Sequence, residues 1–157
     1  MSCGLCCNGA VCEVALVSST TDKSFAKLFR KELDSTLDGE VSRLPLPCFA
    51  FKGKCTQYDL RPLDCKTYQC GLLRKFLSGE ITFESASETI RKALRCLDNT
   101  TSHYNALYDQ SLTRDEISPV LRKLKREADK EGRKKAFWLR FPDYLTFCYL
   151  RVKYFDE

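Results

Sequence analysis

The sequence has a single histidine and few standard metal-binding spacings. One histidine, His103, excludes Cys₂His₂ fingers and three-histidine catalytic zinc sites, and we expect it to be a surface or capping residue. Only Cys3 and Cys6 are spaced as C-x-x-C, whereas a zinc ribbon needs two such pairs. No C-x₂-C-x₂-C run exists, which excludes a bacterial ferredoxin. These familiar sites are therefore ruled out.

Long apolar runs and secretory features are also lacking. No stretch reaches the roughly 18 consecutive apolar residues of a membrane-spanning helix. The amino terminus has neither the basic region nor the apolar core of a secretory signal. If residue 1 is the true start, we expect a cytoplasmic protein. In that reducing compartment, cysteine clusters more often bind metals or act in catalysis than form disulfides.

Most of the cysteines are concentrated in two stretches of the sequence. Of its 10 cysteines, eight lie within residues 3–12 and 48–70, so these stretches organise the chain. At 157 residues, we predict a single domain, with a cysteine-cluster metal-binding region at 1–80 and a helical remainder at 81–157. The predicted fold is mainly α, a small helical domain with an irregular cysteine-rich lobe at its amino-terminal side.

Hydrophobic periodicity predicts most of the helices. Residues 14–17 form either a short buried strand or the exit from the first cysteine loop. Residues 40–62 are predicted to be irregular, with a hairpin-like loop between Cys48 and Cys55. One helix is expected over roughly 22–38, with Gly39 at its end, and another from 65 to about 78. A third begins after an N-cap at Thr82 and is interrupted at 99–102, and a fourth ends near Gly132. The fourth begins either at the capping-box pattern Thr113–Glu116 or at Ser118–Pro119. After Pro142, one helical face is expected to carry Leu145, Cys148, Tyr149, Val152 and Phe155.

Neither cysteine stretch holds a complete four-ligand site at a standard spacing, so we expect the two to converge in space. Four thiolates around a divalent ion leave a net charge of −2. Basic residues of the second stretch could offset that charge, although they fit solvated surface charge equally well; they are Lys52, Lys54, Arg61 and Lys66. Cys96 and Cys148 lie in predicted helices and are interpreted as small buried hydrophobes.

The combined pattern resembles the YkgJ-type cysteine-cluster family, which is described as a zinc- or iron-chelating domain. The pattern is Cys-Gly-x-Cys-Cys, followed by Cys-x₆-Cys-x₅-Arg-Pro-x-x-Cys-Lys-x-Tyr-x-Cys. The resemblance implies zinc or iron, or an iron–sulfur cluster, with Arg61 and Pro62 as framework. It implies these ligands: Cys3, Cys6, Cys7, Cys48, Cys55, Cys65 and Cys70. Cys12 matches no position and could serve as a spare ligand.

Three functions from different classes remain open. The first is a metal-binding protein whose only predicted partner is the metal ion. The second is an iron or iron–sulfur enzyme, because the resemblance extends to the cysteine-rich part of flagellin lysine methylases. The sequence has no phosphate-binding glycine loop and no Ser/His/Asp set, so only a metal centre could supply the chemistry of an enzyme.

The third is a zinc-stabilised nucleic-acid-binding module, supported only by the basic segment Arg122–Lys135. Its eight basic and three acidic residues sum to +5, which equals the net charge of the whole chain. Because acids interleave the bases, the segment is more typical of a solvated helix face, and nucleic-acid binding is disfavoured.

Overall fold

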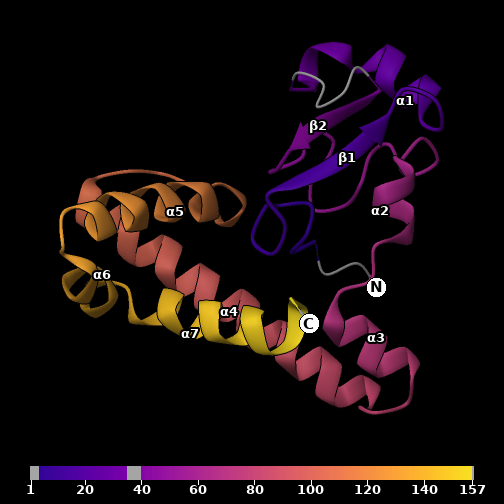
Figure 1. Cartoon of the computed structure of the whole chain (residues 1–157). Coiled ribbons are helices and arrows are strands. Elements are labelled where there is room, and N and C mark those ends of the chain that lie inside the picture. The colour runs from indigo at the N-terminus through magenta and orange to yellow at the C-terminus, as the bar shows by residue number, and fades with distance from the viewer. Residues whose placement is uncertain (1–3, 35–39, 157) are drawn as a thin grey trace. The chain divides into compact units, whose positions relative to one another are not determined.

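The computed structural model describes residues 4–34 and 40–156 (Figure 1). These residues form seven α-helices and one two-stranded sheet, which confirms the mainly helical fold class. The chain folds into two compact units, Met1–Tyr68 and Gln69–Glu157, each considered by itself below. In the described residues, no helix is both long enough and apolar enough to cross a membrane.

The first unit is built on a small antiparallel sheet. Strand β1 (Val14–Ser18) pairs with β2 (Val41–Pro45), with Leu16 opposite Arg43. Ala15 and Val17 point into the core and the intervening residues are exposed, as the two-residue period of a strand requires. The strand expected at 14–17 is thus confirmed, although only one of its faces is buried.

A short helix, α1 (Lys23–Leu28), covers this core, and a 3₁₀ turn, η1 (Arg30–Glu32), follows it. The predicted single helix over 22–38 is therefore wrong. Phe25 and Phe29 pack against Phe49, and the Asp34 N–H then donates to the Arg43 carbonyl at 2.8 Å. Pairing with β2 thus outweighs helical periodicity, and β2 itself lies in a stretch predicted to be irregular. Gly39, the expected helix end, lies outside the described residues.

The helix predicted from residue 65 to 78 is in fact two. Helix α2 (Leu63–Thr67) closes the first unit, and α3 (Gly71–Leu77) belongs to the second. The backbone is extended at Tyr68 and Cys70, which separates the two helices. The expected helical turn around Cys65 exists, whereas Cys70 occupies the N-cap position of α3.

The second unit packs its helices around α4 (Phe83–Tyr108), against which α3, α5 (Arg114–Lys130) and α7 (Pro142–Leu150) lie (Figure 1). Helix α6 (Lys134–Arg140) connects α5 to α7, and a π-helical turn, η2 (Arg151–Phe155), ends the fold. The largest fully buried side chains of this unit come from α4, α5, the α6–α7 junction, α7 and η2: Leu97, Ile117, Leu121, Phe141, Phe147 and Phe155.

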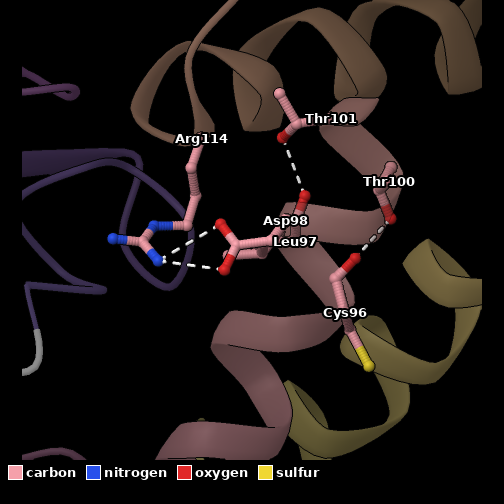
Figure 2. Close-up of polar contacts among 6 residues, drawn as sticks. All are labelled: Cys96, Leu97, Asp98, Thr100, Thr101 and Arg114. Carbon is pink, nitrogen blue, oxygen red and sulfur yellow. Dashed lines mark hydrogen bonds and ion pairs between the residues drawn. The ribbon is translucent and has the colours of Figure 1, made fainter. Parts of the chain in front are cut away.

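Helix α4 is continuous, so the predicted interruption at 99–102 is wrong. The hydroxyl groups of Thr100 and Thr101 donate to the carbonyls of Cys96 and Leu97 at 2.6 and 2.7 Å (Figure 2). Both threonines are buried, and these bonds within the helix satisfy their polar atoms. Residues typical of a turn therefore remain helical. The N-cap at Thr82 is confirmed, since its hydroxyl accepts from the Ser85 N–H.

Helix α5 begins at the predicted capping box and runs through Pro119. The Glu116 carboxylate accepts hydrogen bonds from the N–H and the hydroxyl of Thr113 at 2.8 and 2.7 Å. Arg114, one residue later, lies beside Asp98 of α4 at 3.2 Å (Figure 2). This pair is largely exposed and contributes about 0–1 kcal/mol.

The apolar face predicted for the last helix is wrong in part. Tyr144, Phe147 and Leu150 are the buried residues of α7, whereas Leu145 and Tyr149 are exposed. Of the predicted set, only Phe155 is fully buried. Because the apolar residues of α7 lie on more than one side of the helix, periodicity alone could not identify the side that packs against α4.

Candidate metal centre

The first cysteine stretch forms a tight loop around a buried leucine. Leu5 is fully buried, and its carbonyl accepts from the N–H groups of Ala10 and Val11 at 3.1 and 3.0 Å. The Asn8 side chain is also buried and accepts from the Ala10 N–H at 3.0 Å. These bonds fold residues 4–12 back on themselves, so the backbone around Cys6 and Cys7 has a defined shape.

This loop packs against the start of the second cysteine stretch. The Cys48 N–H donates to the Cys7 carbonyl at 2.8 Å. Gly9, at φ +74°, lies against the Leu46–Pro47 backbone, and a Cβ there would come within 3.1 Å of it. Gly4, at φ +70°, lies closer still to the Phe51 ring, which an added Cβ would meet at 2.5 Å. The expected approach of the two stretches is thus present in their backbones.

Residues 48–55 form the hairpin-like loop that the sequence predicts. Phe51 and Cys55 form a β-bridge, and the Thr56 N–H and hydroxyl both donate to the Ala50 carbonyl at 2.9 Å. Burial raises the pKa of the Cys48 thiol, while hydrogen bonds from the backbone N–H groups of Ala50 and Phe51 act to lower it. Such N–H donors stabilise the ionised sulfur, which is the form that binds metal.

The surroundings of Cys65 disfavour ionisation of its thiol. Burial, followed by repulsion from Cys7, Asp64, Cys48 and Cys55, raises the pKa of Cys65 to about 12. Each of these negative charges disfavours the ionised form of Cys65. Cys48 and Cys65 also both pack against the core around Phe25 and Leu44.

Two aspartates outside the predicted ligand set position the helix that carries Cys65. Asp64 accepts a hydrogen bond from the Leu16 N–H of β1 at 2.8 Å, and Asp22 accepts one from the Leu63 N–H at 2.8 Å. Together they fix the short helix α2 to the sheet. Asp64 directly precedes Cys65, and Asp22 is the N-cap residue of α1. No sequence motif links these two aspartates to each other or to the cysteines.

The two residues that the resemblance implies as framework, Arg61 and Pro62, lie at the start of α2. Pro62 is buried at the N-cap of α2. Arg61 lies over the Tyr58 ring at 3.7 Å, and its Nε donates to the Tyr58 carbonyl at 3.1 Å. No lysine or arginine is among the groups that shift the pKa of Cys65. The interpretation of Lys52, Lys54 and Lys66 as exposed surface charge is the better one.

The structure does not show a finished coordination site. Within residues 4–34 and 40–156, no three cysteine, histidine, aspartate or glutamate side chains are arranged to hold one metal ion. Cys3 lies outside the described residues, and Cys70 belongs to the second unit. Cys6 and Cys12 are half-buried in the first loop. The thiols of Cys48, Cys55, Cys65 and Cys70 are not in disulfides.

No family model, curated protein or solved structure matches this chain. The resemblance to the YkgJ-type cysteine-cluster family therefore stays a prediction. Its implied ligands also stay predictions, and their support must come from the residues themselves.

The remaining candidate residues lie in the second unit. Cys96 is buried on α4 and Cys148 half-buried on α7, and burial raises the pKa of both thiols, as expected of cysteines that fill space. His103 is exposed and meets the Phe141 ring edge-on at 5.8 Å. In the basic segment Arg122–Lys135, Lys125 pairs with Asp129 at 2.7 Å, and Arg133 pairs with Glu131. Carboxylates of the same segment thus neutralise part of its charge.

Proposed function

We propose that the first unit binds a thiophilic metal ion, zinc or iron, with Cys7, Cys48, Cys55 and Cys65 as the central ligands. The observations that support this most directly are the hydrogen bond from the Cys48 N–H to the Cys7 carbonyl at 2.8 Å and the packing of Cys48 and Cys65 against one core. The four thiols come from three separate segments: the first loop, the hairpin and α2. Convergence of distant thiols is what a tetrahedral thiolate site requires.

The donor set fits such an ion in its chemistry. Thiolates favour zinc and iron–sulfur clusters over magnesium or calcium. A bound cation would offset the repulsion that arises when these sulfurs ionise together, and backbone donors already point at Cys48. Metal binding would therefore draw the side chains together and stabilise the fold. Cys3, Cys6 and Cys70 are the further candidate ligands of a second ion or a cluster. The proposal includes a reducing compartment such as the cytoplasm.

Metal analysis and an absorption spectrum of anaerobically purified protein test this proposal. Bound zinc in a colourless protein indicates a structural or carrier site. A brown protein with visible absorption indicates an iron–sulfur cluster and favours the alternative function, an iron-dependent enzyme. Protein without stoichiometric metal, and with no uptake of Co²⁺ or Zn²⁺ under reducing conditions, refutes the proposal.

Serine variants assign the ligands. Cys65→Ser and Cys48→Ser should lose bound metal, whereas Cys148→Ser should keep it, because that thiol lies in the second unit among packing side chains. Cys70→Ser tests whether the full predicted set takes part. Equal metal loss in all variants, Cys148→Ser included, would contradict the assignment.

A further inference from the structure

Helices α6 and α7 expose apolar side chains that the fold leaves uncovered. Leu139 is 73% exposed, Leu145 is 46% exposed and Tyr149 is 61% exposed. Leu145 and Tyr149 are four residues apart on α7, so they share one helix face. The opposite face packs into the core through Tyr144 and Phe147. Exposed apolar side chains gathered on one helix face mark a surface that binds a partner.

The surface at Leu139 is also concave. Two open hollows, of about 670 and 690 Å³, are both lined by Leu139 and Pro142. Leu107 and His103 also line the first hollow, and Trp138 and Leu145 also line the second. Both linings are mostly apolar. We call the two hollows and their rim the Leu139 surface.

The rim of the Leu139 surface is positively charged. Arg140 lines the first hollow, and Lys134 and Lys135 line the second. Among the described residues, none of these three pairs with a carboxylate. The one acidic residue of the lining, Asp143, accepts a hydrogen bond from the Asn99 side chain at 3.4 Å. The segment Arg122–Lys135, which ends at this rim, carries a charge of +5. A ligand of this surface should be apolar at its centre and acidic at its edge.

We propose that the Leu139 surface binds an acidic amphipathic helix of a protein partner. Apolar side chains one turn apart on that helix would enter the two hollows, and its carboxylates would meet Lys134, Lys135 and Arg140. A second copy of this chain fits worse, because a two-fold contact would bring the same cations face to face. A flat anionic bilayer would leave the hollows unfilled.

The chain contains its own reporter for this test. Trp138 is the only tryptophan and lines the second hollow. The probe is a synthetic helical peptide with leucines at i, i+3, i+4 and i+7 and glutamates elsewhere. Titrating it into the full chain should change the indole fluorescence saturably, and added salt should weaken binding because the rim contacts are exposed.

Matched variants separate apolar docking from charge. Leu139→Ser should weaken binding about tenfold or more, as loss of a central apolar contact does. The double variant Lys134→Glu, Lys135→Glu should weaken it similarly. Leu28→Ser, at a leucine that is 65% exposed, and the double variant Arg91→Glu, Lys92→Glu are the controls and should bind normally. Circular dichroism confirms that each variant is folded.

Several results would overturn the proposal. One is the absence of a saturable change, and another is equal binding of a peptide with lysines in place of the glutamates. Equal weakening by the control variants would show that the effect is not local to the surface. Sedimentation that reveals a dimer broken by Leu139→Ser would assign the surface to a second copy. Binding of anionic phospholipid vesicles, but not of the peptide, would assign it to a membrane.

Discussion

Replacing Gly9 with alanine tests how the two cysteine stretches are joined. Gly9 combines a left-handed backbone with close contact to the Leu46–Pro47 main chain, at 3.1 Å from an added Cβ. Gly53 provides a matched control, because its φ of +71° is nearly the same and nothing lies within 4 Å of an added Cβ. The two substitutions share the backbone strain and differ only in the contact.

The expected magnitudes follow from these two contributions. A left-handed L-residue costs about 1–2 kcal/mol, and reduced freedom of the unfolded chain returns about 0.4–1 kcal/mol. Gly53→Ala should therefore destabilise by about 1 kcal/mol. Gly9→Ala adds overpacking against main-chain atoms that cannot rotate away, about 1–3 kcal/mol more.

Native-state hydrogen exchange measures this contact directly. The Cys48 amide, which donates to the Cys7 carbonyl at 2.8 Å, reports the free energy of opening the junction. Gly9→Ala should speed its exchange far more than Gly53→Ala does, and should weaken Zn²⁺ or Co²⁺ binding as Cys7 moves. Equal effects of the two substitutions would show that the first loop does not pack on residues 46–47, and would remove the geometric basis of the proposed site.

Three further predictions concern other parts of the fold. Asp64→Ala, which removes the acceptor of the Leu16 N–H, should destabilise the first unit by about 1 kcal/mol and reduce metal affinity, measured by competition with a chelator; unchanged affinity would show that α2 needs no such support. Hydrogen bonds from Thr113 lower the pKa of Glu116, so its stabilising contribution is complete above the ordinary carboxyl pKa and is lost as pH falls through the lowered value. The stability difference between Glu116→Gln and the natural chain should accordingly shrink on acidification, and a constant difference would contradict the hydrogen-bond origin. Reversing the charges of Lys123, Lys125 and Lys134 should abolish weak retention on a phosphate resin without changing metal content; tight, salt-resistant binding to one defined nucleic acid that these changes abolish would instead establish a nucleic-acid function.

The sequence predicts well whatever depends on local signals. Thr82 caps its helix because its hydroxyl reaches a backbone N–H three residues on. The Cys48–Cys55 loop closes as a hairpin within eight residues, and Thr113 with Glu116 forms the expected capping box. In each case the residues that decide the structure are neighbours in the chain, so a single sequence contains the necessary information.

The errors arise where distant contacts decide the outcome. The helix expected over 22–38 stops because Asp34 pairs with Arg43. Helix α4 continues because Thr100 and Thr101 are buried by its neighbours and bond within the helix. Among the candidate ligands, the sequence shows the cysteines, but the backbone contact of Cys7 with Cys48 and the attachment of α2 to β1 through Asp64 depend on the folded sheet. Local propensity cannot reveal these tertiary contacts.

The contacts that assemble the first unit have a consequence for the order of events during synthesis. Cys7 meets Cys48 across 41 residues, and Leu16 meets Asp64 across 48. Because Cys48 and Asp64 are made later, the contacts that hold the first loop and β1 against the rest of the unit cannot form when these segments leave the ribosome. At translation rates of roughly 5–20 residues per second, Cys6 and Cys7 wait about 3–12 s for Cys65 to be made. During that interval the nascent thiols lack the contacts of the folded unit and are open to oxidation.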